Sequence, residues 1–258
     1  MRDLRMIHSA NALFRSLLAA TFLALLLATP ADAQRMQQRD RPADDVAGAF
    51  DYYTLVLSWS PTYCASQPSN DSDPQCRHNS PRPYAFVLHG LWPQYEKGYP
   101  EYCRTRERPF VPRRIIDGML DIMPSPRLVI HEYRKHGTCS GLDPVGYYDL
   151  SRKLFDKITI PQRFIAPEQP FFVTPSELAN DFLKANPGLE RDMFAIECHG
   201  SGNRLRDVRI CFSREGNFRS CGDNEHPRRL CRAGRMYVPP VRSGGASILP
   251  GPRGQRSL

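Results

Sequence analysis

Eight cysteines constrain this chain more than any other feature of its sequence. They are Cys64, Cys76, Cys103, Cys139, Cys198, Cys211, Cys221 and Cys231. Their number is even, and no two of them show the C-x-x-C spacing typical of zinc sites. In an oxidising compartment such a set predicts up to four disulfides. The pairing stays open at this point, because eight cysteines allow about a hundred connectivities.

The N-terminal segment gives a reason to expect an oxidising compartment. Residues 1–33 combine a basic start, an uncharged apolar stretch at 16–28 and the small-residue pattern Ala31-Asp32-Ala33. This arrangement predicts a signal peptide cleaved after Ala33, and therefore an exported protein, periplasmic or extracellular. An uncleaved membrane anchor is the alternative, but the apolar stretch is short for a bilayer about 30 Å thick. After cleavage we expect no association with a membrane.

Composition divides the rest of the chain into one domain with two polar ends. Residues 34–49 lack an apolar period and predict a flexible leader. Residues 239–258 are rich in Gly, Pro, Ser and Arg and predict a disordered basic tail. The stretch between them, residues 50–238, has the size of a single domain.

Apolar patterning within this domain predicts both strands and helices. Runs of β-branched and aromatic residues predict strands at 52–59, 84–88, 193–198, 207–212 and 236–238. Helical spacing and N-terminal Ser-Pro or Thr-Pro pairs predict helices at 112–122, 125–136, 146–158 and 174–186. The two kinds of element do not alternate regularly, which favours the α+β class.

Two short segments hold the residues with chemical potential. The first, His89-Gly90-Leu91-Trp92-Pro93, follows the predicted strand 84–88. The second, residues 131–139, reads HEYRKHGTC. On a helix of about 100° per residue, His131 and Lys135 lie about 40° apart and His136 lies about 140° from His131. Together with Glu132, these side chains occupy one broad face that can line a cleft.

Acid–base chemistry fits this set better than a metal site does. Helical zinc sites use histidines at i and i+4, whereas His131 and His136 are five residues apart and no third ligand is near. Two imidazoles with an ordinary pKa near 6.5 can act as one neutral base and one protonated acid. A nearby lysine stabilises negative charge on a phosphoryl group. Without a Ser or Cys nucleophile, the set suits RNA transesterification, in which the 2′-hydroxyl attacks and no cofactor is required.

The two segments resemble the active-site segments of the ribonuclease T2 family of secreted endoribonucleases. Residues 59–64 (WSPTYC) are similar to a first-strand segment of that family, and the resemblance extends over residues 50–240. It implies a disulfide-stapled α+β fold with a central antiparallel sheet flanked by helices. It also implies a monomer that cleaves single-stranded RNA through 2′,3′-cyclic phosphates to 3′-phosphate products.

The resemblance assigns catalytic roles to three residues. His136 is expected to act as the base towards the 2′-hydroxyl and His89 as the acid towards the leaving oxygen. Glu132 is expected to steady the transition state. Tyr133 stands where many members of the family carry tryptophan, and Gln94 occupies a position that varies among them. Base preference therefore stays open.

Three further residues are expected to bind the RNA substrate. The resemblance implies that His131 binds the phosphate, that Lys135 stabilises its developing charge, and that Trp92 packs near a base. It also implies the disulfides Cys64–Cys76, Cys103–Cys139, Cys198–Cys231 and Cys211–Cys221. The second of these would tie the end of the catalytic helix to the loop that follows the first segment.

The basic residues are compatible with RNA as a partner. The net charge is +8, and 30 of the 35 basic residues are arginines, which favour bidentate phosphate contacts. Clusters at residues 204/206/209 and 228/229/232/235 could steer a polyanion or form an ordinary cationic surface.

Three other functions remain open from the sequence. An inactive RNA-binding protein on the same fold is expected to lack part of the ionisable set, which is complete here. A metal-dependent phosphodiesterase would lose activity to a chelator. A structural or inhibitory exported protein would be indifferent to a His89→Ala substitution.

Overall fold

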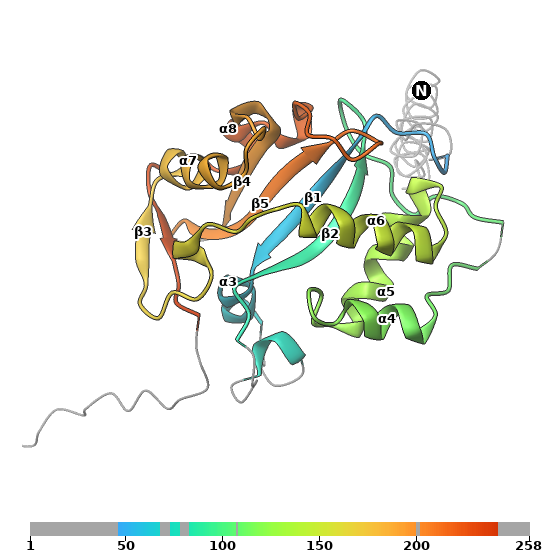
Figure 1. Cartoon of the computed structure of the whole chain (residues 1–258), viewed down its shortest axis with the longest axis horizontal. Helices are drawn as coiled ribbons and strands as arrows, with labels where there is room; N and C mark the ends of the chain where they lie inside the picture. Colours follow the sequence, from blue (N-terminus) through green and yellow to red (C-terminus); the bar gives the residue numbers. More distant parts are fainter. Residues whose placement is uncertain (1–45, 68–72, 78–82, 107, 200–201, 242–258) are drawn as a thin grey trace, which may run out of the picture. The chain divides into compact units, whose positions relative to one another are not determined.

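The computed structural model describes residues 46–67, 73–77, 83–106, 108–199 and 202–241 (Figure 1). The predicted signal peptide, residues 34–45 of the leader and residues 242–258 of the tail lie outside these ranges. Packing extends past the predicted ends of the domain. The Gly48 amide donates to the Cys139 carbonyl at 2.9 Å, and the buried Val241 donates to Pro167 at 2.8 Å. The boundary expected at residue 238 therefore lies at least three residues too early.

A mixed sheet of six strands carries the fold. The strands are β1 (Tyr52–Trp59), β2 (Phe86–Gln94), β3 (Phe171–Val173), β4 (Phe194–His199), β5 (Arg204–Phe212) and β6 (Met236–Val238). Their order is β2-β1-β5-β6-β3, and β4 pairs with β5. The β5–β6 pair is parallel at Arg204 and Tyr237, whereas the other described pairs are antiparallel. The central sheet is thus mainly antiparallel, as expected, with one parallel contact at its β5–β6 pair.

Strand β2 continues through the first histidine segment, where the sequence predicted that the strand would end. Gly90 pairs with Val56 and Leu88 pairs with Leu57, so His89 is an extra residue without a partner on β1. Such a bulge re-aims the side chain of the inserted residue and is common beside active sites. The register therefore explains how a histidine in the middle of a strand can be directed at its own site.

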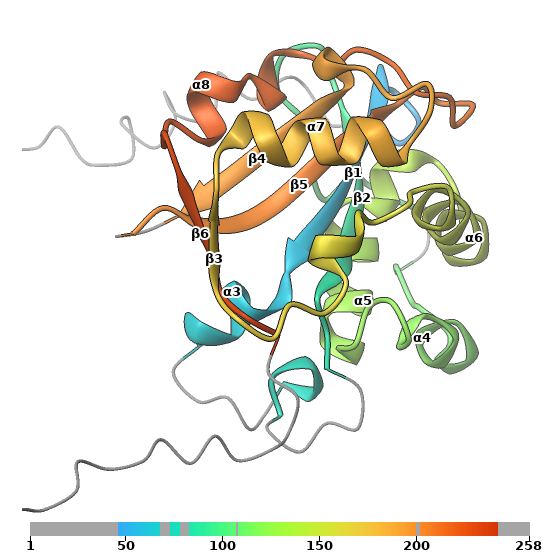
Figure 2. The same ribbon diagram turned by 60° about the vertical axis from the view of Figure 1, so that its left-hand side comes forward.

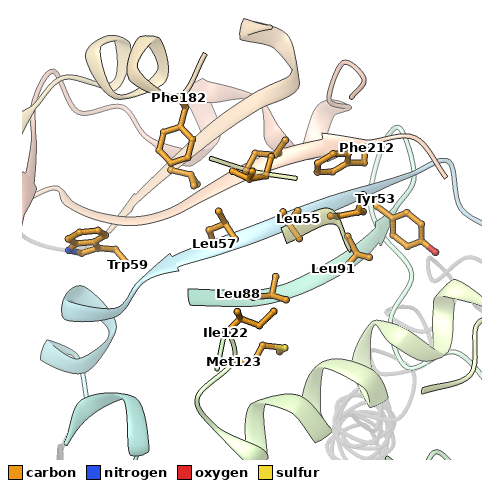
Figure 3. Packing of buried hydrophobic residues seen from close by; sticks show 14 of the residues in the cluster. Tyr53, Leu55, Leu57, Trp59, Leu88, Leu91, Ile122, Met123, Phe182 and Phe212 are labelled. Atoms are coloured by element: carbon orange, nitrogen blue, oxygen red, sulfur yellow. The ribbon is translucent and has the colours of Figure 1, made fainter. Parts of the chain in front are cut away.

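The apolar face of the sheet packs into the core. Leu55 and Leu57 of β1 share this core with Leu88 of β2, and Figure 3 shows Phe182 near the same cluster. The alternate residues of β1, among them Thr54 and Ser58, belong to the opposite face. One face of the sheet thus holds the fold together, and the other is available for polar groups.

Helices cover both ends of the sheet (Figures 1 and 2). They are α3 (Ser60–Ala65), α4 (Arg113–Met119), α5 (Pro126–Lys135), α6 (Pro144–Asp156), α7 (Pro175–Ala185) and α8 (Pro227–Leu230). Helices α5 and α6 contact β2, whereas α7 and α8 contact β4. The predicted start of α7 is present as a capping box, in which Thr174 and Glu177 each accept from the other's backbone amide. Because α5 contacts β2, it lies beside the bulged strand.

The structure contains the four disulfides that the resemblance implies. They are Cys64–Cys76, Cys103–Cys139, Cys198–Cys231 and Cys211–Cys221. Cys139 lies in the 3-10 turn directly after α5, and Tyr102, next to Cys103, donates its amide to the Lys135 carbonyl at 2.8 Å. The Cys103–Cys139 bond therefore ties a distant loop to the end of α5.

Candidate active site

Helix α5 presents its polar residues to two different environments. Glu132 is 1% exposed and His136, which caps the helix, is 3% exposed, whereas His131 is exposed. Lys135 is half-buried and forms an ion pair with Glu101 at 3.5 Å. The broad face that the sequence predicted is thus divided, since Glu132 and His136 are covered while His131 reaches solvent.

Trp92 links the two histidine segments. Its indole nitrogen donates to Glu132 Oε2 at 2.7 Å. Its ring stacks on His136, with centroids 4.9 Å apart and planes at 22°, and meets His89 edge-on at 5.4 Å. Trp92 therefore contacts all three residues expected to be catalytic, and its position helps to fix theirs.

Gly90 leaves room for this arrangement. A Cβ atom at this position would lie 2.0 Å from Glu132 Oε2 and 2.7 Å from the Trp92 indole nitrogen. Both distances are far below van der Waals contact. A side chain on Gly90 would displace the carboxyl group, which explains why the residue between His89 and Leu91 has none.

His89 is held from its other side by a buried polar pair. Its Nδ1 lies 2.9 Å from Ser58 Oγ, and that hydroxyl donates to Asp207 Oδ1 at 2.5 Å. Because the single hydroxyl proton goes to Asp207, Ser58 can only accept from His89, which assigns the Nδ1–H tautomer. The other nitrogen, Nε2, then carries the chemistry and lies 3.5 Å from Glu132 Oε1.

Burial sets the ionisation of the central groups. It lowers the pKa of His89, and the cations Arg206 and Arg209 lower it further. It also lowers the pKa of His136, to which Lys135 adds. Burial raises the pKa of Glu132 to about 8, although the Trp92 hydrogen bond opposes that rise. At neutral pH the site therefore favours uncharged imidazoles beside a protonated carboxyl group.

Arginines extend the polar network across the sheet. Arg209 is bonded to Glu197, lies 4.0 Å from Glu225 and has its guanidinium 5.3 Å from the centre of the Trp92 ring. Arg206 also binds Glu197, at 2.9 Å. Two of the three arginines in the 204/206/209 cluster are thus paired with carboxylates, and one of them, Arg209, also lies over the Trp92 ring.

A pocket of about 520 Å³ opens beside these groups. Its lining includes His89, His131, Ser58, Tyr63, Gln75 and Leu128. Of these, only the two histidines were predicted to belong to the site. Ser58 and Asp207 were missed. Ser58 interrupts the apolar second half of β1, and that interruption is a signal that could have found it, whereas Asp207 lies in the arginine-rich strand β5 and has no such signal.

Neither a metal centre nor a membrane span emerges from the described residues. Within those ranges, no three His, Cys, Asp or Glu side chains are grouped so as to hold a metal ion. No helix in the same part of the chain has the length and apolar character needed to cross a membrane.

Fold and site together define a disulfide-bonded ribonuclease-like protein, and known proteins identify its family. The sequence model of the ribonuclease T2 family matches residues 50–221. A ribonuclease of Aeromonas hydrophila is 38% identical over 201 residues, which cover 73% of this chain and 84% of that protein. The ribonuclease T2 protein rnst-2 of Caenorhabditis elegans is 30% identical over 208 residues, covering 71% and 72% of the two chains. This chain belongs to the ribonuclease T2 family and is a ribonuclease T2-type enzyme.

Solved structures agree at the level of the fold. RNase NT, in complex with 5′-AMP, superposes with a TM-score of 0.56 at 24% identity. Trichomaglin, described as an S-like ribonuclease, gives a TM-score of 0.59 at 22% identity. Each comparison covers 74% of this chain and 98% of the other. The α+β arrangement described above is therefore the family fold.

Proposed function

We propose that this protein is a metal-independent endoribonuclease that cleaves single-stranded RNA by attack of the 2′-hydroxyl on the adjacent phosphate. The observation that carries the proposal is the contact of Trp92 with His89, Glu132 and His136, since His89 also lines an open pocket. Two imidazoles beside a carboxyl group supply a base, an acid and a hydrogen-bond donor. No cofactor enters the reaction.

His136 and His89 divide the proton transfers. Neutral His136 removes the 2′-hydroxyl proton, the 2′-oxygen forms a bond to phosphorus, and the bond to the 5′-oxygen breaks. Protonated His89 gives its Nε2 proton to that departing oxygen, and Ser58 keeps Nδ1–H in place. The products are a 2′,3′-cyclic phosphate and a free 5′-hydroxyl.

The cyclic phosphate is then opened by water. His89, now neutral, accepts a proton from the water molecule, and His136, now protonated, returns one to the 2′-oxygen. The product is a 3′-phosphate, and both histidines regain their starting states. The two imidazoles thus exchange roles between the two steps, because the first step leaves each in the protonation state that the second step needs.

Three groups stabilise charge on the phosphoryl oxygens. Glu132, kept protonated by burial, donates a hydrogen bond to one of them. His131 and Lys135 supply positive charge from the exposed side of α5. Trp92 orients Glu132 and His136 and lies next to the base of the attacking nucleotide. The pocket beside His89 and His131 receives substrate.

The proposed setting is outside the cytosol. Four disulfides and membership of this family are typical of exported proteins, so we propose a monomer that acts on RNA in the periplasm or outside the cell.

Product analysis in the presence of a chelator tests the mechanism. The mature protein is incubated with a defined RNA and with its all-deoxy counterpart in excess EDTA. Cleavage of the RNA alone, with 2′,3′-cyclic phosphate ends, is the expected result. Cleavage that requires an added divalent ion would favour a metal-dependent phosphodiesterase. Intact RNA under both conditions would favour a binding protein.

A further inference from the structure

Two neighbouring aromatic rings on strands β6 and β3 are flanked by two arginines, one on β5 and one directly before β6. The Arg204 guanidinium lies 5.5 Å from the centre of the Tyr237 ring. Tyr237 and Phe172 are cross-strand neighbours with ring centroids 5.5 Å apart. Arg235 lies 5.2 Å from the centre of the Phe172 ring. We call these four residues the Arg/aromatic ladder.

The ladder faces away from the core. Phe172 alternates with Phe171 and Val173 on β3, and Tyr237 lies between Met236 and Val238, both fully buried. Phe172 itself is 55% exposed. An exposed phenylalanine flanked by a tyrosine and two arginines gains little for the folded state, because its large apolar surface remains in water.

The ladder also lies on the face of the sheet that carries the active site. On β5, Leu205 pairs with Cys198 and Asp207 pairs with Glu197, so Arg206 is an extra residue in a bulge. Leu205 is fully buried, which directs its neighbour Arg204 to the opposite face. The bulge returns Asp207, the partner of Ser58, to that same face about 10 Å from Arg204.

A second pocket lies beside the ladder and shares a lining residue with the pocket at the active site. It has a volume of about 330 Å³, and its lining includes Arg204, Tyr237, Tyr84, Arg77 and Gln75. Gln75 also lines the 520 Å³ pocket beside His89 and His131. The two pockets therefore both reach Gln75, and we infer that a strand leaving the first can continue to the second (Figure 2 shows β3 and β6 side by side).

The arginines of the ladder are available for a ligand. Neither Arg204 nor Arg235 is within ion-pair distance of a carboxylate in the described part of the chain. Arg163 provides the contrast, since it also lies over an aromatic ring of β3, that of Phe171, but is paired with Asp181 at 3.2 Å. The ladder thus combines two guanidinium groups that form no ion pair in this part of the chain with one exposed and one half-buried ring.

We propose that the Arg/aromatic ladder is a second RNA-binding surface, which holds single-stranded RNA outside the nucleotides being cleaved. The inference rests on the proposed function. Bases stack on Phe172 and Tyr237, and the two guanidiniums contact phosphates, which is the combination that single-strand-binding proteins use. The surface gives long RNA an advantage over a dinucleotide, which is too short to reach it.

Comparison of two substrate lengths tests this surface. The value of kcat/KM is measured for a dinucleotide and for a 20-nucleotide single-stranded RNA with the unaltered protein and with a Phe172→Ala/Tyr237→Ala variant. We expect the double variant to keep dinucleotide turnover within about twofold and to lose about tenfold in kcat/KM for the long RNA, through KM. Tyr237→Phe, which keeps the ring, should retain the advantage.

Direct binding separates this proposal from the cleavage mechanism. Fluorescence anisotropy with a 2′-O-methyl oligonucleotide, which lacks the attacking hydroxyl, measures affinity without turnover. An Arg204→Gln/Arg235→Gln variant should reduce the slope of log affinity against log salt by about 1.4, since each phosphate contact on a single strand contributes about 0.7. Arg163→Gln is the matched control and should leave both affinity and slope unchanged.

The outcomes are distinguishable. Unchanged affinity and unchanged length dependence in both double variants, with the folded state verified by circular dichroism, would overturn the second surface and leave the cleavage mechanism intact. An equal loss on both substrate lengths would also overturn it, because the ladder would then act only through the active site. Failure of the unaltered protein to cleave RNA would count against the mechanism, while the anisotropy measurement would still decide whether the ladder binds.

Discussion

Ser58 Oγ lies 2.9 Å from Nδ1 of His89 and donates its own proton to the buried Asp207. The pair connects a residue of β5 to the histidine through β1, although the three residues are far apart in the sequence. It determines which imidazole nitrogen faces the substrate. The Ser58 hydroxyl group thus positions the proposed acid.

Removal of this hydroxyl should weaken catalysis more than binding. Ser58→Ala is expected to lower kcat about tenfold with little change in KM, which corresponds to about 1.4 kcal/mol for one lost hydrogen bond. Ser58→Thr, which keeps the hydroxyl, should recover most of the loss. The tautomer of His89, read from ¹⁵N chemical shifts, should change only in the alanine variant. A rise in KM alone, with kcat and the tautomer unchanged, would remove this role. The control is Ser151→Ala, since Ser151 is buried but bonded only to Tyr147.

Glu132 should make the protein less stable as the pH rises. Its folded-state pKa is raised to about 8 from an ordinary value of 4.5, so the folded state binds the proton more tightly than the unfolded state does. Stability is therefore lost between these two pH values. Glu132→Gln should raise the unfolding free energy at pH 8 by up to about 4 kcal/mol and by much less at pH 5. Calorimetry at the two pH values measures the difference, and a gain at pH 5 as large as that at pH 8 would refute it.

Substitutions of Glu132 also test whether it acts as a protonated hydrogen-bond donor or as an ionised carboxylate. If Glu132 acts as a protonated donor, glutamine can still accept from Trp92 and donate to phosphate, whereas alanine can do neither. We expect Glu132→Gln to keep at least about a tenth of kcat and Glu132→Ala to lose about a hundredfold. Equal losses in the two variants would show that the ionised carboxylate is required.

The pH profile of kcat/KM should be bell-shaped, with both limbs on the acid side of 6.5. Burial and nearby cations lower the pKa of both histidines. The base must be neutral, which sets the acid limb, and the acid must be protonated, which sets the alkaline limb. Arg206 lowers the pKa of His89, so Arg206→Gln should move the alkaline limb to higher pH by a few tenths of a unit. A shift of the acid limb to higher pH, with the alkaline limb unmoved, would reverse the assignment of acid and base.

A single methyl group at Gly90 should disable the site although no ionisable residue is replaced. The Cβ of Gly90→Ala would collide with Glu132 Oε2. We expect kcat to fall about a hundredfold while the protein stays folded, because misplacement by about 1 Å has effects of that size. Gly118→Ala on α4 is the matched control, since a Cβ there meets nothing within 4 Å. Full activity of the Gly90 variant would mean that Glu132 is dispensable.

Two truncations should differ although they are only three residues apart. Loss of residues 242–258 should leave stability and activity unchanged. Loss of residues 239–258 also removes Pro239, whose carbonyl accepts from the buried Trp59 indole at 3.1 Å, and Val241. That variant should unfold several degrees lower, because the lost contacts amount to about 2 kcal/mol. Equal melting temperatures would show that residues 239–241 contribute nothing to the fold.

Local patterns in the sequence predicted most of the elements. The strand at 52–59 and the short strand at 236–238 agree with β1 and β6, and the Thr-Pro start of α7 is present as predicted. Such features depend on residues close together in the chain. The limits of β2 were missed, because its second half is stabilised by pairing with β1 and not by its own apolar pattern.

The candidate site likewise has residues that local sequence predicts and residues that depend on strand pairing. His89, His131, Glu132, Lys135 and His136 were found because they lie in two compact segments, and the structure brings these segments together through Trp92. Ser58 and Asp207 were missed because their meeting depends on the register of β1 against β5. No local signal reports such a register.

The bond between Cys103 and Cys139 has a consequence for the cell that makes this enzyme. It links the end of α5 to a loop 36 residues earlier, and native bonds of this kind are worth about 2–5 kcal/mol. Where thiols are kept reduced, the chain lacks that tether, as well as the other three. With the export proposed above, the ribosomes and messengers around a nascent chain would be spared, because the nuclease would acquire its disulfides only after it has left them behind.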